Sequence, residues 1–150
     1  MKDLQIAYLN GKTGTLTEPK RAFLPVTLPS LNVWPKWHWA LKKKHQATLY
    51  YLIIQAWGVA PNDWPQAKRF LHVIEYRPGT LDQDNLEGSV KPLIDVLKRW
   101  IVPPSPKRKK NPYGVPGAGW IWDDCPAWFG YKVDQIRTKR ANVGTVLLLQ

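Results

Sequence analysis

Four aspartates, arranged as two close pairs, are the residues of this chain whose type and spacing could do chemistry. Asp82 and Asp84 lie two residues apart, whereas Asp123 and Asp124 are adjacent and follow the apolar segment 120–122. In an extended segment, residues i and i+2 point to the same side, with roughly 7 Å between their Cα atoms. Carboxylates directed at one point repel each other unless a cation or proton lies between them. Because Mg²⁺ prefers carboxylate oxygens, the pattern predicts a Mg²⁺ site.

Each pair also has an ordinary structural explanation. Asp82, Asp84 and Asn85 are typical turn residues, and Asp123 can begin a turn before Pro126. For either pair alone, this explanation is the better one. The metal interpretation gains weight because both pairs occur in a chain with only 11 acidic residues against 22 Lys and Arg.

The net charge of +11 favours a polyanionic partner, of which nucleic acid is the most common. A basic protein kept in solution by its charge would explain a smaller excess better. The predicted phosphate contacts fall in three basic clusters: Lys42, Lys43 and Lys44; Lys107, Arg108, Lys109 and Lys110; and Arg137, Lys139 and Arg140. Any single one of these is more often a solvated charge, but the run 107–110 in a proline-rich loop favours a DNA-contacting arm.

Several other classes of site and location are disfavoured by the composition. Cys125 is the single cysteine, so a disulfide or a cysteine zinc site within one chain is excluded. The three histidines have no ligand spacing, so no zinc is expected. The N-terminus is too polar for a signal peptide, and no apolar run approaches a membrane span. We therefore expect a cytoplasmic protein that does not act in a membrane.

The elements that must position the acids are predicted from periodicity, glycine and proline. Strands are predicted at residues 21–28, 69–76, 130–138 and 145–149, the first at a sheet edge because Pro25 interrupts it. Helices are predicted at 37–57 and at 90–100, the second capped by Ser89, with residues 80–87 irregular between elements. The order β-α-β-α-β-β predicts one α/β domain with a mixed sheet and two main helices.

Two further segments and the tryptophans complete this outline. Residues 1–20 are a weakly specified lead-in with a small hairpin around Gly11–Gly14, and residues 103–119 form a long basic, proline-rich loop. Trp37, Trp39, Trp57 and Trp100 are expected in the core. For Trp128, stacking on an unpaired base is an alternative to core packing.

Three stretches of the chain resemble the RusA-like Holliday-junction resolvases, which are phage and prophage endodeoxyribonucleases. They are Asp82-Gln83-Asp84-Asn85-Leu86, Lys91-Pro92-Leu93-Ile94-Asp95-Val96-Leu97 and Trp120-Ile121-Trp122-Asp123-Asp124. The family pattern is D-x-D-N-L, a lysine, D-A-L on a helix, and then an apolar segment ending in D-D. Residues 28–34 followed by His38-Trp39 are also similar to phage members. The resemblance covers most of residues 21–150.

This resemblance implies specific roles for the acids and for one lysine. Asp82, Asp84 and Asp124 match catalytic metal ligands, with Asp123 beside them, and Lys91 matches the catalytic lysine. Lys91 is placed by its register from Asp95, and its alternative is a solvated helix lysine. Extra residues around 87–89 and a longer loop at 103–119 depart from the family pattern.

The implied activity is Mg²⁺-dependent hydrolysis of phosphodiesters at branched DNA, with Mn²⁺ as a possible substitute, in DNA recombination and repair. Family members are homodimers, so a homodimer is expected here, in the host cytoplasm if the chain is phage-encoded. Two rival interpretations stay open. One is a non-catalytic basic DNA-binding protein whose aspartates are turn residues, and the other is a nuclease that acts on flaps or forks.

Overall fold

A computed structural model of the chain describes residues 19–150. The predicted lead-in therefore lies outside the described residues except for Pro19 and Lys20, and the predicted hairpin around Gly11–Gly14 lies wholly outside them.

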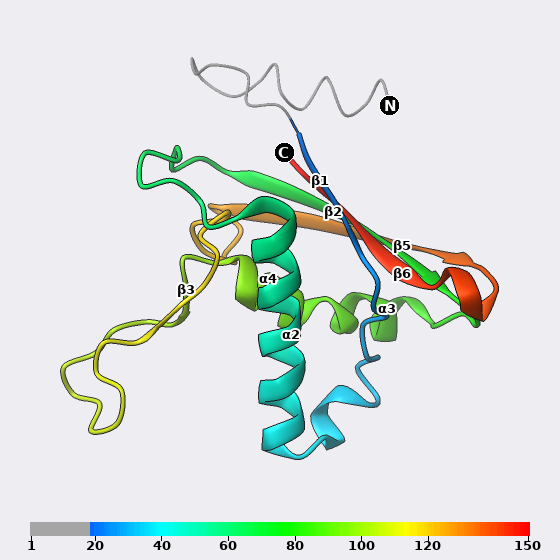
Figure 1. Cartoon of the computed structure of the whole chain (residues 1–150), viewed down its shortest axis with the longest axis horizontal. Helices are drawn as coiled ribbons and strands as arrows, with labels where there is room; N and C mark the ends of the chain where they lie inside the picture. Colours follow the sequence, from blue (N-terminus) through cyan, green and yellow to red (C-terminus); the bar gives the residue numbers. More distant parts are fainter. Residues whose placement is uncertain (1–18) are drawn as a thin grey trace.

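A mixed sheet of four strands forms one layer of the fold (Figure 1). Its strands are β1 (Lys20–Leu24), β2 (Arg69–Arg77), β5 (Phe129–Arg137) and β6 (Gly144–Leu149), in the spatial order β1-β6-β2-β5. β2 and β5 are parallel, whereas β6 runs antiparallel to both β1 and β2. β1 ends directly before Pro25 and lies at an edge, since proline cannot donate a ladder hydrogen bond. The predicted mixed sheet and edge strand are confirmed.

Three helices pack against one face of this sheet: α2 (Trp39–Trp57), α3 (Gln83–Ser89) and α4 (Lys91–Leu97) (Figure 1). α2 begins at the cap residue His38, whose Nδ1 accepts from the Ala40 N–H at 3.3 Å, and ends at Gly58 with a φ of 72°. Positive φ is a conformation that glycine adopts without steric cost. No other described element covers the opposite face of the sheet.

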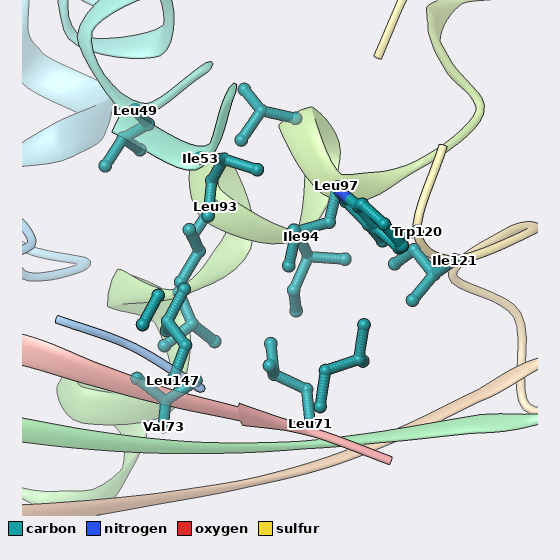
Figure 2. Packing of buried hydrophobic residues seen from close by; sticks show 14 of the residues in the cluster. Leu49, Ile53, Leu71, Val73, Leu93, Ile94, Leu97, Trp120, Ile121 and Leu147 are labelled. Atoms are coloured by element: carbon teal, nitrogen blue, oxygen red, sulfur yellow. The ribbon is translucent and has the colours of Figure 1, made fainter. Parts of the chain in front are cut away.

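The core lies between the helices and the sheet (Figure 2). Leu49 and Ile53 from α2 and Leu93 and Leu97 from α4 are fully buried there. They meet the inward side chains of the sheet, of which Leu71, Val73 and Leu147 are buried to the same degree. Burial of each such side chain contributes about 1.5–3 kcal/mol, so this layer contact holds the fold together.

The region between β2 and α4 differs from the prediction. Residues 83–89 form α3 instead of an irregular segment, and the helix expected at 90–100 is confined to Lys91–Leu97. Pro92 separates the two helices because it has no N–H to donate to the carbonyl four residues earlier. Ser89 is not a helix cap: its Oγ donates to the Leu86 carbonyl at 2.6 Å. Asp82 is the cap of α3.

Most of the loop predicted at 103–119 is an arm that projects from the body of the protein (Figure 1), whereas Gly117 and Ala118 near its end are buried. At its base, β3 (Trp100–Val102) pairs antiparallel with β4 (Val115–Pro116). Two short 3-10 helices, Trp34–Lys36 and Arg140–Asn142, complete the described elements. No helix within residues 19–150 combines the length and apolarity needed to cross a bilayer.

The tryptophans divide differently from the prediction. Trp39 is 64% exposed, so its assignment to the core is wrong. The reason is that the N-terminal end of α2 points away from the sheet, so its first turn lies beyond the core (Figure 1). Trp57 packs against the core as expected. Trp37 and Trp100 are only half-buried.

Candidate active site

Asp82 and Asp84 lie at the start of α3. Asp82 accepts two hydrogen bonds from Asn85, one from its backbone N–H at 3.0 Å and one from its side-chain Nδ2 at 2.8 Å. The backbone bond first, and the side-chain bond second, lower the pKa of Asp82. Asp84 is exposed in the first turn of α3, and its side chain makes no hydrogen bond or ion pair within residues 19–150. Asp82 is extended but Asp84 is helical, so the two carboxylates are not related as alternate residues of one extended segment.

Two sets of hydrogen bonds fix the entry to α3. Gln135 on β5 clamps the residue before Asp82: its Oε1 accepts from the Leu81 N–H at 2.9 Å, and its Nε2 donates to the Leu81 carbonyl at 2.6 Å. From the other side, the Asn32 N–H donates to Asn85 Oδ1 at 3.0 Å. Asn85 therefore ties the loop before α2 to the aspartate that caps α3.

A buried ion pair under the end of α3 connects this helix to the sheet. Glu75 on β2 has no exposed surface, and its carboxylate lies 3.1 Å from the Arg77 guanidinium. The Ser89 Oγ also lies 3.4 Å from the Glu75 carboxylate. Burial raises the pKa of Glu75, although the Arg77 charge and hydrogen bond oppose the rise. This contact holds α3 against β2.

Asp124 contacts two lysines: Lys91, at the start of α4, and Lys98, which follows the end of α4. The Lys91 ammonium donates to Asp124 Oδ2 at 2.5 Å and to Asp95 at 3.1 Å. Lys98 lies 3.0 Å from Asp95 and 3.5 Å from the same oxygen of Asp124. Lys91 and Asp124 are thus in direct contact, although they lie 33 residues apart in the chain. The family resemblance matches both to one site.

The charges of this cluster are mutually stabilised. The hydrogen bond from Lys91 is the main cause that lowers the pKa of Asp124 to about 2. Burial would lower the pKa of Lys91, but its bonds to Asp124 and Asp95 outweigh burial and raise it. Both groups are therefore fully charged at neutral pH, with a carboxylate beside an ammonium.

The segment before Asp124 is fixed by the core below it. Trp120 and Ile121 are buried beside Leu97 of α4 (Figure 2). The Ile121 N–H donates to the Leu97 carbonyl at 3.2 Å, and Ile121 forms a parallel bridge with Lys98. Asp123 then accepts from the Asp124 N–H at 2.8 Å. The Asp123 carboxylate therefore helps to fix the backbone conformation of Asp124.

A cavity of about 190 Å³ adjoins the Lys91–Asp124 contact. Its lining includes Glu87 from α3 and Tyr131 from β5, neither of which was predicted for the site. Glu87 follows Asp84 by three residues, which places both on one side of a helix. That signal is visible only once residues 83–89 are recognised as helical.

Both halves of the acidic constellation lie along β5, an edge strand. Gln135 holds the Asp82 half, and Tyr131 borders the Asp124 half, four residues earlier on the same face. Four residues of strand span roughly 13 Å. Within residues 19–150, no three acidic, histidine or cysteine side chains lie close enough together to hold a metal ion. The Mg²⁺ site of Asp82, Asp84 and Asp124, with Asp123, therefore stays a prediction.

The predicted phosphate-contacting residues lie in three places. Lys42, Lys43 and Lys44 are in the first turns of α2, where the Lys42 ammonium donates to the Pro35 carbonyl at 3.1 Å and Lys43 lies over the exposed Trp39 ring at 5.4 Å. In the arm, Arg108 donates to the Pro103 carbonyl at 2.9 Å, which leaves three exposed lysines there: Lys107, Lys109 and Lys110. Arg137, Lys139 and Arg140 are exposed around the end of β5.

Comparisons with known proteins gave no match to a family model, to a curated protein or to a solved structure. The functional interpretation therefore depends on the residues and their geometry.

Proposed function

We propose that this chain is a Mg²⁺-dependent endonuclease that cuts four-way or other branched DNA junctions. The observation that supports this most directly is the contact between Lys91 and Asp124 at a cavity beside α3. The motif resemblance independently implies that both residues belong to one catalytic centre. The contact between them places a carboxylate and an ammonium group side by side at the wall of a cavity.

The oxygen donors of the site have the chemistry that Mg²⁺ requires. The Asp84 side chain is exposed and makes no hydrogen bond or ion pair within residues 19–150. Each carboxylate oxygen of Asp82 accepts one hydrogen bond. A carboxylate oxygen can accept two, so Asp82 keeps free lone pairs. Both lysine contacts of Asp124 end on Oδ2, which leaves Oδ1 for a cation. In this proposal Asp82, Asp84 and Asp124 would hold the ion once the two halves, which are separate in this structure, come together around it. The bound ion would supply a polarised phosphate oxygen and an acidified water.

Lys91 is the residue of this chain that neutralises charge on the phosphate. Its raised pKa keeps it cationic at neutral pH, and its ammonium lies at the cavity wall. A fixed cation beside the scissile phosphate stabilises the negative charge that grows there in the transition state. Lys98, which shares Asp124 and Asp95 with Lys91, orients this ammonium by holding the two carboxylates.

The three basic clusters supply DNA affinity in this proposal. Each phosphate that a Lys or Arg neutralises releases counterions, so affinity falls as salt rises. A homodimer would present two such surfaces and two catalytic centres related by a two-fold axis. That arrangement suits paired cleavage of two like strands at a junction.

The deciding experiment incubates a synthetic four-way junction with Mg²⁺ and compares wild type with Asp84→Asn. We expect paired nicks at symmetric positions from wild type and none from the variant, with junction binding retained. Asp134→Asn is the matched control, since Asp134 is also a part-exposed carboxylate but lies on the outer sheet face, 2.6 Å from His72. Flaps, forks and plain duplex in the same panel define the substrate. Junctions left uncut under all Mg²⁺ and Mn²⁺ conditions would overturn the proposal.

One specific observation favours a second candidate, a DNA-binding protein without catalysis. Asp82 caps a helix and Asp124 neutralises two lysines, so each aspartate already has a structural role. In that case junction binding is independent of Mg²⁺, and Asp84→Asn changes neither binding nor the DNA. The same panel, repeated with EDTA, separates the two candidates.

A further inference from the structure

A groove lined by tryptophan and arginine begins beside the candidate catalytic centre. It consists of two adjoining clefts of about 260 Å³ and 280 Å³. They share Arg99, Trp100 and Trp122 in their linings, so one continues into the other. We call these two clefts together the Trp–Arg groove.

The inner end of the Trp–Arg groove has a rigid aromatic floor. Trp120 is buried and donates its indole N–H to the Gly58 carbonyl at 2.9 Å. Trp64 packs edge-on against Trp120 at 4.9 Å and donates to the Trp120 carbonyl at 3.2 Å. The Arg69 guanidinium covers Trp64 at 4.5 Å. The Lys20 ammonium lies 4.2 Å from the centre of the Trp120 ring. These contacts hold both rings in place.

The outer end is where a ligand can be reached by a cation and by an aromatic surface together. Arg99 is exposed, and its guanidinium lies 4.6 Å from the centre of the half-buried Trp122 ring. Trp100 lines the same space. Planar guanidinium and indole groups are the surfaces on which nucleobases stack, and every base has a face that suits them.

The size and charge of the groove select among possible occupants. Each cleft is smaller than the ~300–1,000 Å³ of a pocket that encloses a drug-sized ligand, which suits one planar ring. Two cations, Lys98 and Arg99, and one acid, Asp123, line the outer cleft in a chain of net charge +11, so the ring should belong to a polyanion. An unpaired base with its phosphate meets both conditions.

The groove leads directly from the candidate catalytic residues. Its outer cleft is lined by Lys98 and Asp123. Lys98 is 3.5 Å from Asp124, and Asp123 accepts from the Asp124 N–H. Pro103, at the base of the basic arm, borders the same cleft. A strand that passes Asp124 could therefore enter the groove while the arm contacts its phosphates.

We propose that the Trp–Arg groove binds an unpaired nucleobase, with its adjoining phosphate, of a single-stranded polynucleotide. The assignment of that strand to branched DNA depends on the proposed function, but the binding itself does not require cleavage. Within the proposed function, the groove would make the enzyme select branches that carry unpaired bases next to the cut.

The test measures binding of fluorescein-labelled 12-nucleotide strands to the full chain in EDTA, by anisotropy. The strands are oligo-dT, oligo-rU and an abasic deoxyribose-phosphate strand of equal charge. Stacking contributes a factor of about 10 or more per base, so we expect oligo-dT to bind at least about 10-fold tighter than the abasic strand. The same preference for rU would identify RNA as an equally suitable source of the base. Equal affinity for the base-containing and abasic strands would overturn the proposal.

Two variants and a control locate the preference. Arg99→Gln and Trp122→Leu should each reduce the dT-to-abasic ratio at least about 3-fold, whereas Trp122→Phe should keep most of it. Lys132→Gln removes one charge from the outer sheet face, where Lys132 pairs with Asp134, and should leave the ratio unchanged. An unchanged ratio in folded Arg99→Gln would contradict the site even if Trp122→Leu were unstable. Failure here appears as base-independent binding in EDTA, whereas failure of the proposed function appears as uncut junctions in Mg²⁺.

Discussion

The two halves of the acidic constellation are stabilised by different physical means. Asp82 accepts hydrogen bonds from a neutral amide and a backbone N–H of Asn85, whereas Asp124 is paired with the two ammonium groups of Lys91 and Lys98. The first arrangement arises within one helical turn. The second joins residues that are far apart in the chain and depends on how α4 packs beside the segment that ends at Asp124.

Because of this difference, salt and changes in core packing should affect the Asp124 half more than the Asp82 half. Hydrogen bonds to a neutral partner are insensitive to salt, while a part-exposed ion pair is screened by it. A local cap survives small shifts of the core, but a tertiary ion pair does not. The predictions below change one half at a time.

The largest effect is expected on cleavage when Asp124 loses its charge. Asp124→Asn should reduce junction cleavage at least about 100-fold, since loss of even an outer-shell partner of a metal site costs 10–100-fold. Single-turnover rates on a labelled junction measure this. Asp95→Asn is the matched control because Asp95 contacts the same two lysines but is absent from the lining of the cavity. Equal losses in both variants would assign Asp124 to charge balance alone.

The next largest effect is a loss of stability on the Asp124 side. A Cβ at Gly117 would lie 2.0 Å from the Lys98 carbonyl oxygen, so two backbone segments must separate. Gly117→Ala should lower the free energy of unfolding by about 1–3 kcal/mol. On the other half, a Cβ at Gly88 meets the side chain of the exposed Leu31 at 2.7 Å.

Gly88→Ala should therefore change stability by less than about 1 kcal/mol, because a gain in helix propensity offsets the movement of Leu31. Gly79→Ala is the control, since nothing lies within 4 Å of its added Cβ. Urea denaturation of the three variants gives the order. A Gly117 variant as stable as the Gly79 variant would mean that the close contact of residues 98 and 117 does not hold the Asp124 segment.

A third prediction concerns the charge of Asp124 itself. Lys91→Met removes the main cause of the low pKa of Asp124, so this pKa should rise from about 2 toward the ordinary 3.8. Carboxyl ¹³C NMR titration measures this. Because the folded pKa is depressed, the stabilisation is present above pH 3.8 and is lost as pH falls toward about 2. Acid unfolding of Lys91→Met should accordingly show less dependence on pH in that window.

The dependence of the Asp124 pKa on salt tests the same ion pair. At 1 M NaCl the Debye length is about 3 Å, so the pKa of Asp124 in wild type should rise while that of Asp82 changes less. An Asp124 pKa that ignores both salt and Lys91→Met would show that the ion pair does not control this carboxylate.

The sheet could be predicted from sequence because its signals are local. The β-formers of 69–76, the alternation of 130–138 and the break at Pro25 each correspond to an observed strand or edge. α3 was missed because it is seven residues long and polar on most of its surface, so its periodicity is too short to recognise. Its start signal, an aspartate followed by an N–H donor three residues later, also fits a turn.

The contacts of the site were predictable only in part. The motifs put Lys91 and Asp124 together, but no pattern indicated Lys98 as a second partner of Asp124. That contact requires Ile121 to pair with Lys98, which depends on the packing of α4. Likewise, Glu87 and Tyr131 come from separate elements whose approach is a tertiary property. Sequence spacing carries little information about such approaches.

The smallest change in stability is expected for substitutions at Asp82, and they separate its two roles, helix cap and metal ligand. As the cap of α3, Asp82 accepts from the Asn85 N–H, and asparagine caps helices about as well as aspartate. Asp82→Ala should therefore lose about 1 kcal/mol, and Asp82→Asn should lose less, because its amide oxygen keeps the bond from the Asn85 N–H but its NH2 cannot accept from Asn85 Nδ2. If the carboxylate serves only as a cap, Asp82→Asn also keeps whatever DNA cleavage wild type shows. If it also holds Mg²⁺, cleavage falls in both variants alike, because the amide has lost the charge that attracts the ion. Urea denaturation and junction cleavage, measured on the same preparations, distinguish the two cases. A stable, inactive Asp82→Asn would show that the capped half of the constellation takes part in the chemistry together with the ion-paired half.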